Sequence, residues 1–307
     1  MYLLYFCITT LIFLSINNTI NGASFFDSNG HLSQVDSALK AATNGGNILA
    51  IKNDNKKKVI AVLWSPIKPG IDMDDDENNN NNIQKLSNQL LLCGAGVAAD
   101  VSFLRNRIFD DVLSHRYLYN TESIIDRLAA TTASYMHEST LSMRHRPFGA
   151  RILFLGLDES PLSSIPRARL LELDPIGNCH DCLLTCIGPY TEHIMEAING
   201  YAGHDDRNRN RNNSDDDKQK DHINMKGRDI LSLLYNNKVE NHDEDKEDFD
   251  LEDEMKCISL VLDVMQDQGV DRDEARKQIT VVKVDENGAG PLSKNDLNRI
   301  FQRIPGL

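Results

Sequence analysis

The expected strands of this chain fall in blocks separated by helices, and this order limits the fold more than any single motif does. Apolar residues that recur every three or four positions predict helices, and short apolar runs between turn residues predict strands. In chain order the predicted segments are a helix at 32–42, strands at 48–51, 59–64 and 90–96, helices at 97–117 and 121–138, strands at 150–157, 168–173 and 182–187, a helix from Thr191, a helix at 254–266, a strand at 280–284 and a helix at 293–303. A parallel doubly wound sheet needs strands and helices that alternate. The order instead predicts an α/β fold of two packed antiparallel sheets with helices on both outer faces, a four-layer α/β/β/α sandwich.

Two acidic, low-complexity stretches interrupt this pattern. Residues 72–82 (DMDDDENNNNN) and 205–253 contain little apolar material, and the second stretch holds 16 acidic against 9 basic side chains. Such stretches bury too little apolar surface to pack, so we expect both to be solvated loops within a single domain that covers 24–307. The net charge of −13 lies almost wholly in these two stretches. The near-neutral remainder argues against a nucleic-acid partner, which needs clustered Lys and Arg.

The first 23 residues have the character of a targeting leader. Residues 2–14 (YLLYFCITTLIFL) form an uncharged run of 13 residues, which the small residues Gly22 and Ala23 follow. As a helix this run is about 20 Å long, too short for an apolar bilayer core of about 30 Å but of the size of a signal-peptide core. We therefore expect a leader at 1–23 and no membrane contact in the mature form. Because no basic residue precedes the run, an incorrect start codon and a buried segment are the alternatives.

Several separated motifs resemble those of α-type subunits of the proteasome core particle. The first is 26–38 (FDSNGHLSQVDSA), a turn that leads into a helix, and its matching signature residues are Gly30, Leu32, Gln34, Val35 and Ala38. The others follow in the family's order: 93–107 (CGAGVAADVSFLRNR), 114–116 (SHR), 146–149 (RPFG), 173–178 (LDPIGN) and 187–188 (IG). The resemblance covers 26–200 and 254–303, and it implies the sandwich fold of the N-terminal-nucleophile hydrolases.

The positions that match the catalytic residues of the family's proteolytic β-type subunits lack the chemistry for peptide hydrolysis. Those subunits use an N-terminal Thr whose own amine acts as the base. Gly46, which has no hydroxyl, matches the Thr, and Leu63 or Trp64 matches the acidic partner, so that only Lys85 remains of the three. The resemblance therefore implies a subunit without catalytic residues inside a threonine-type endopeptidase complex. The alternatives are a free-standing hydrolase of this fold, activated by cleavage elsewhere, and a diverged binding module.

The resemblance implies a role in assembly and docking. The expected role is a structural subunit of an outer ring of seven α subunits, which supports ring assembly, gating and activator docking in ubiquitin-dependent protein degradation. The implied partners are other α subunits, β subunits and an activator or regulatory particle. Gly45, Lys85 and Gly96 match a pocket between neighbouring α subunits that takes the terminal carboxylate of an activator tail, a ligand that suits the compact charge of a Lys. Residues 23–25 (ASF) stand where the family has a gate-closing Tyr-Asp-Arg segment.

The expected location follows from the family and from the leader. Ordinary α-type subunits are cytosolic and nuclear. Here residues 23–26 (ASFF) also resemble the junction of bipartite leaders in algae with complex plastids. A compartment associated with such a plastid is therefore the alternative location if the leader is used.

The cysteines favour free thiols over a metal site. Residues 179–182 (CHDC) and Cys186 carry ligand types that suit zinc, but no second pair of ligands accompanies them. In the family these residues begin a core strand, and the resemblance therefore implies that Cys182 and Cys186 share one face and Cys179 lies on the other, all as buried free thiols. Residues 285–288 (DENG) lack the Gly and Glu positions of a calcium loop. We therefore expect no metal and no cofactor.

Overall fold

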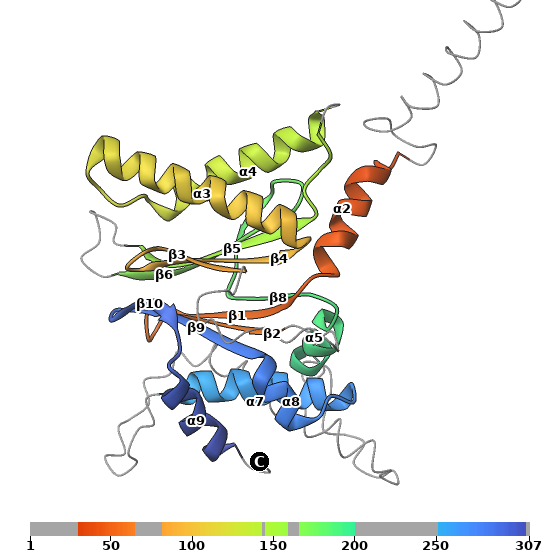
Figure 1. The fold of residues 1–307 in the computed structure, drawn as a ribbon, viewed down its shortest axis with the longest axis vertical. Helices are drawn as coiled ribbons and strands as arrows, with labels where there is room; N and C mark the ends of the chain where they lie inside the picture. Colours follow the sequence, from red (N-terminus) through yellow and green to blue (C-terminus); the bar gives the residue numbers. More distant parts are fainter. Residues whose placement is uncertain (1–29, 65–81, 143–144, 159–165, 200–250, 305–307) are drawn as a thin grey trace, which may run out of the picture.

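The computed structural model describes residues 30–64, 82–142, 145–158, 166–199 and 251–304, which form two five-stranded sheets between two layers of helices (Figure 1). Sheet A has the strand order β10-β9-β2-β1-β8, and sheet B has the order β3-β4-β5-β6-β7. All pairs of neighbouring strands in both sheets are antiparallel. The predicted four-layer sandwich is confirmed.

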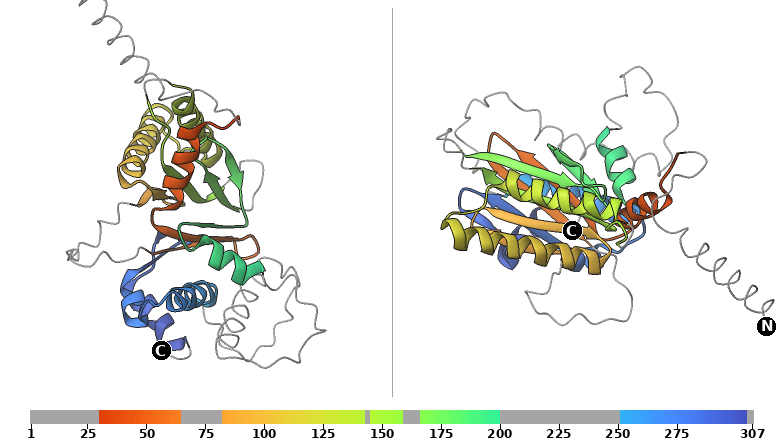
Figure 2. Two further views of the ribbon diagram at one scale, coloured as in Figure 1. Left: turned by 90° about the vertical axis from the view of Figure 1, so that its right-hand side faces the viewer. Right: turned by 90° about the horizontal axis from the view of Figure 1, so that it is seen from above.

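The elements that build each layer come from distant parts of the chain. Sheet A contains β1 (Asn47–Asn53), β2 (Lys58–Trp64), β8 (Leu184–Ile187), β9 (Ile279–Asp285) and β10 (Gly288–Pro291). Sheet B contains β3 (Ile83–Ser87), β4 (Leu90–Gly96), β5 (Ala150–Asp158), β6 (Arg167–Leu173) and β7 (Cys179–Asp181). The outer face of sheet B is covered by α3 (Ala98–Tyr119) and α4 (Ile125–Leu141), and that of sheet A by α5 (Thr191–Asn199), α7 (Glu252–Asp267), α8 (Arg272–Gln278) and α9 (Lys294–Arg303) (Figure 1). The remaining described helix, α2 (Ser33–Thr43), stands across one end of the sandwich (Figure 2).

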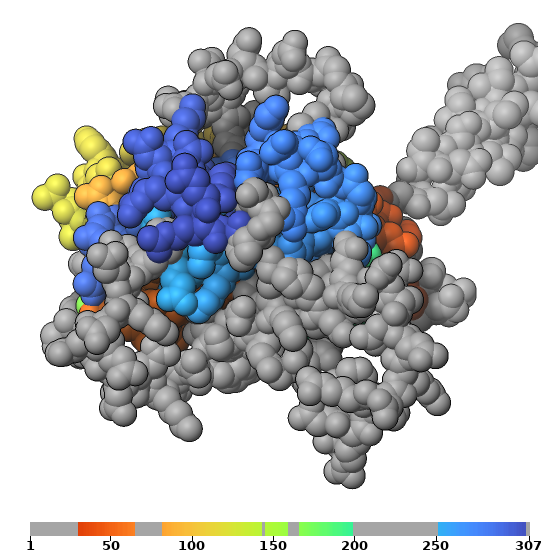
Figure 3. All heavy atoms as spheres, turned by 90° about the horizontal axis from the view of Figure 1, so that it is seen from below, coloured from red at the N-terminus to blue at the C-terminus, as the bar shows by residue number. Residues whose placement is uncertain are grey.

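Three apolar clusters hold the four layers together, one on each outer face and one between the sheets. Strand β1 contributes to two of them because its side chains alternate. Ile48 and Ala50 pack between the sheets, whereas Leu49 and Ile51 pack toward the helices over sheet A. Seen from below, α7, α8 and α9 form the surface over this sheet (Figure 3). In the part of the chain that the structure describes, no helix is both long and apolar enough to cross a membrane.

The predicted strand at 182–187 begins later than expected, as β8 at Leu184, and the single strand expected to carry Cys179, Cys182 and Cys186 is divided between the two sheets. The chain forms the short edge strand β7 on sheet B and then crosses to sheet A, where β8 pairs with β1. The Cys182 N–H donates to the Leu170 carbonyl on sheet B at 2.9 Å, while the next residue, Leu183, accepts from the Lys52 N–H on sheet A at 2.8 Å. Because adjacent residues bond to different sheets, the chain must leave one sheet at this point. The apolar pattern does not predict β3, β10 or α8.

The expectation of a solvated loop that extends to residue 253 is wrong at its C-terminal end. Helix α7 begins at Glu252, and Asp253 and Glu254 are buried. The Lys56 ammonium lies 2.9 Å from an Asp253 oxygen, and the Lys58 ammonium lies 2.6 Å from a Glu254 oxygen. A buried carboxylate needs such a partner to offset the loss of hydration. Residues 205–250, residues 72–81 and the leader at 1–23 lie outside the described residues.

Candidate functional site

Helix α2 carries most of the family-signature residues and contacts β4 and β5 at one end of sheet B. Ala38 is buried on its inner side, and Gln34 and Val35 are half-buried. Leu32 occupies the N-cap position. Gly30 precedes the helix with a φ of 84°, a conformation that favours glycine. The signature residues thus define the start of α2 and the side on which it packs.

Three glycines bring separate backbone segments into direct contact at the end of α2, and we call Gly45, Gly96 and Gly149 the glycine junction. A Cβ on Gly45 would lie 2.2 Å from the Gly96 nitrogen, and a Cβ on Gly96 would lie 2.2 Å from the Gly149 carbonyl oxygen. Gly96 also has a φ of 120°, which other residues rarely adopt. The end of α2, the end of β4 and the loop before β5 can therefore meet this closely because Gly45 and Gly96 have no side chain. Two of the predicted pocket residues, Gly45 and Gly96, lie together here.

A buried carboxylate fixes the loop that leads into this junction. Asp100, which is 6% exposed, accepts two hydrogen bonds from the Arg146 guanidinium, each at 2.7 Å, and one from the Gly149 N–H at 2.8 Å. The hydrogen bond and the charge of Asp100 raise the pKa of Arg146. Bidentate contacts of this kind fix orientation as well as adding energy. They hold the Arg146-Pro147-Phe148-Gly149 turn against the first turn of α3.

An aromatic patch lies beside the same turn. Phe103 of α3, Tyr135 of α4 and Phe148 have ring centroids 5.6 to 6.3 Å apart, and the Arg107 guanidinium lies 5.0 Å from the centroid of Tyr135. Phe103 is 50% exposed. Aromatic and Arg side chains that remain accessible are typical of protein interfaces. Phe103, Arg107 and Phe148 belong to the family motifs 93–107 and 146–149, whereas Tyr135 of α4 lies outside every motif and has no sequence signal for this role.

Lys85 lies apart from the glycine junction within one chain. It is exposed on β3, where it pairs with Leu91 of β4. Gly96 lies five residues farther along β4, a separation of about 17 Å at about 3.4 Å per residue. The structure therefore places together two of the three predicted pocket residues and leaves the third on the other end of the strand pair.

The positions matched to catalytic residues lie around the start of sheet A. Gly46 connects α2 to β1, so its nitrogen is part of a peptide bond. Leu63 is buried between the sheets, and Trp64 is buried toward α7 and α8. Neither position presents an acidic group to Gly46.

The cysteines do not share one buried strand, so that expectation is wrong for two of the three. Cys179 is exposed on β7 and Cys182 is half-buried after it, whereas Cys186 is buried on β8. Burial raises the pKa of Cys186 to about 12, and burial followed by the charges of Glu172 and Asp181 raises that of Cys182 to about 11. The five described cysteines are free thiols. Among the described residues, no three His, Cys, Asp or Glu side chains gather as a metal site would require.

Comparison with known proteins gives the family of this fold. A family model described as proteasome subunit matches residues 43–208. Proteasome subunit alpha type-7-1A of Drosophila melanogaster is 25% identical over 183 residues, which are 59% of this chain and 70% of the relative. Proteasome subunit alpha type-8 of Mus musculus is 27% identical over 173 residues (56% and 65%), and proteasome subunit alpha type-6 of Saccharomyces cerevisiae is 25% identical over 197 residues (62% and 79%). The motifs, the sandwich and the matched half of the chain agree, and the chain belongs to the proteasome subunit family as an α-type subunit.

Proposed function

We propose that this chain is a non-catalytic structural subunit of a proteasome α ring. In that ring it would contact neighbouring α subunits on its sides and β subunits on one face. The family match over residues 43–208 carries this proposal. The end of the molecule formed by α2, the glycine junction and the aromatic patch supports it, because this end is closely packed and keeps Phe103 and the Arg146 side chain accessible. A surface of this composition is suited to a permanent contact with another protein.

Two features of the start of β1 support the proposal that this chain has no catalytic role. Gly46 has no hydroxyl or thiol, and its nitrogen is bonded to the preceding residue instead of being a free amine. Helix α2, directly before it, is folded onto β4 and β5. A hydrolase of the N-terminal-nucleophile type needs a hydroxyl or thiol and a free amine at this position. The free-standing hydrolase is therefore not favoured.

The activator-tail pocket is proposed to form only across a subunit boundary. Gly45 and Gly96 supply a backbone surface that side chains leave open, and Lys85 supplies a charge too distant to reach it within the same chain. The backbone surface of Gly45 and Gly96 would then form part of one pocket, and Lys85 would form part of another. In each pocket the neighbouring α subunit would supply the remaining part. A lysine ammonium is a suitable partner for a tail carboxylate in either case.

Purification of the tagged full chain from its own cells tests the assembly. We expect it to recover the other α subunits and the β subunits in one particle of discrete size. The same particle, treated with a Thr-directed epoxyketone, should carry the label on β subunits and none on this chain. Recovery of the chain alone would contradict the ring role, and label on this chain would contradict the absence of catalysis.

The location and the extent of the domain are part of the proposal. We propose that residues 24–307 form one domain and that 1–23 act as a targeting leader, with the cytoplasm and nucleus as the family location and a plastid-associated compartment as the alternative. Fluorescence of a reporter fused to residues 1–40 separates the two. A diffuse cytosolic signal with Met1 retained would remove the leader from the proposal.

A further inference from the structure

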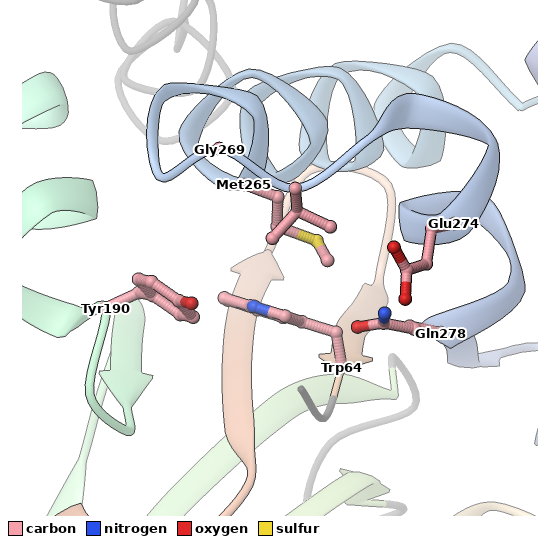
Figure 4. Close-up of a pocket in the computed structure, with 7 residues that line it drawn as sticks. Trp64, Tyr190, Met265, Gly269, Glu274 and Gln278 are labelled. Atoms are coloured by element: carbon pink, nitrogen blue, oxygen red, sulfur yellow. The ribbon is translucent and has the colours of Figure 1, made fainter. Parts of the chain in front are cut away.

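A small cavity opens between sheet A and the helices that cover it, away from the glycine junction. Its volume is about 170 Å³, and its walls come from the end of β2, the residue before α5, and the α7–α8 connection (Figure 4). Met265 and Val270 form the apolar wall, and Tyr190 stacks near Trp64 with ring centroids 6.5 Å apart and planes inclined by 21°. The cavity is therefore bounded in part by aromatic and aliphatic side chains.

Two polar atoms that line this cavity have no hydrogen-bond partner among the described residues. They are the indole N–H of Trp64, a side chain that is 2% exposed, and the amide oxygen of Gln278. Figure 4 shows the Trp64 ring between Tyr190 and Gln278, with Glu274 beside Gln278. Buried donors and acceptors in proteins are nearly always bonded. An unpaired donor and an unpaired acceptor that line the same cavity indicate that something supplies the missing bonds.

We propose that this cavity binds a small, neutral, single-ring aromatic molecule that carries a hydroxyl group. A cavity of about 150 Å³ accommodates benzene, whereas pockets for larger ligands begin at about 300 Å³. The ring packs against Met265, Val270 and the two aromatic side chains. The ligand hydroxyl accepts from the Trp64 N–H, and its proton is available to the amide oxygen of Gln278. The Glu274 carboxylate disfavours an anionic ligand, which excludes aromatic acids.

The full chain provides its own reporter, because Trp64 is its single tryptophan. Phenol is the probe, and benzene, which has the same ring without the hydroxyl, is the matched control. Titration followed by Trp64 fluorescence, excited beyond the absorption band of phenol, should show saturable binding of phenol that is tighter than that of benzene. Binding of benzene at equal or higher affinity, or no saturable change with phenol, would overturn the proposal in favour of a cavity that holds only water.

Three variants and one control variant locate the binding site. Gln278→Leu should weaken phenol binding roughly 2- to 10-fold and leave benzene unaffected, the value of one neutral hydrogen bond. Gln84→Leu on β3, in the other sheet, is the matched control and should bind phenol as the unchanged chain does. Val270→Phe fills the cavity and should abolish binding of both molecules. Trp64→Phe, measured by calorimetry, should remove the preference for phenol over benzene. If Val270→Phe melts as the unchanged chain does and still binds phenol, the ligand lies elsewhere and the proposal fails.

Discussion

Replacing Gly45 by Ala tests the close backbone contact between the end of α2 and the end of β4. The new Cβ would lie 2.2, 2.5 and 2.6 Å from the N, Cα and O atoms of Gly96. Backbone atoms cannot rotate away as a side chain can, and Gly96 is itself held against the carbonyl oxygen of Gly149. The end of α2 must therefore move away from β4. Forced overpacking of this kind costs about 1–3 kcal/mol, and we expect the upper part of that range.

Gly290→Ala is the matched control for this substitution. A Cβ on Gly290 meets no atom within 4 Å, and its φ lies outside the left-handed region. The lower entropy of the unfolded chain should then stabilise this variant by about 0.4–1 kcal/mol. Equilibrium unfolding in urea, followed by the fluorescence of the single tryptophan, should separate the two variants by about 2–4 kcal/mol.

A second readout follows assembly. If α2 shifts, Gly45→Ala should enter the core particle in cells less than Gly290→Ala does at equal expression. Equal unfolding free energies together with equal incorporation would refute the close contact and, with it, the role of the glycine junction in placing α2.

Three further predictions use other parts of the molecule. Asp100→Asn should lower the free energy of unfolding, because the Asn side chain cannot accept all three hydrogen bonds that the Asp100 carboxylate accepts. The expected loss is about 1.5–3 kcal/mol, nearer the lower value because the Arg146 side chain is largely exposed. An unchanged urea midpoint would contradict this prediction. Lys85→Ala should weaken activator-tail binding about 10-fold or more while the ring stays intact, and Lys85→Arg should restore part of it; unchanged affinity in the alanine ring would remove Lys85 from the pocket. Burial raises the pKa of Cys93 to about 12. The contribution of the protonated Cys93 thiol to the free energy of unfolding is therefore fully present below the unfolded pKa of about 8.5, and it is lost as the pH rises toward the folded pKa. The free energy of unfolding should therefore fall above about pH 9, by up to about 1.4 kcal/mol per pH unit for each buried thiol; Cys93→Ala should make this fall less steep, and stability that rises with pH would contradict it.

The elements that could be predicted from sequence are those with enough apolar residues to form a periodic pattern or a continuous run between turn residues. The hairpin at 47–64 is an example, since every residue of β1 and β2 is buried and the turn between them is polar. The missed elements lack such a signal. Helix α8 has the sequence RDEARKQ and buries only Ala275, and in β3 only Leu86 is buried. Their positions are set by what packs against them, which local composition does not reveal.

The candidate site was predictable only where a motif carried it. The family signature located α2, and the match to pocket residues located two members of the glycine junction. The bond between Asp100 and Arg146 joins residues 46 positions apart, and the contact of Lys56 with Asp253 joins residues 197 apart. Neither pairing follows from spacing or periodicity, because both depend on how the sheets and helices pack. The crossing at Cys182 was missed for the same reason, since an apolar run does not tell which sheet it joins.

Under the proposed function, helix α2 links the shape of this chain to its lack of catalysis. Ala38 and Ala42 are buried where α2 meets sheet B, and the chain passes from that helix through Gly45 and Gly46 directly into β1. Cleavage before Gly46 would create a free amine at the start of β1, but it would also release α2 and uncover the ends of β4 and β5. The new terminus would still have no hydroxyl or thiol to act as a nucleophile. Helix α2, Gly45 and Gly46 thus have two effects. They form a stable surface for a neighbouring subunit, and they leave the start of β1 without a free amine or a nucleophile.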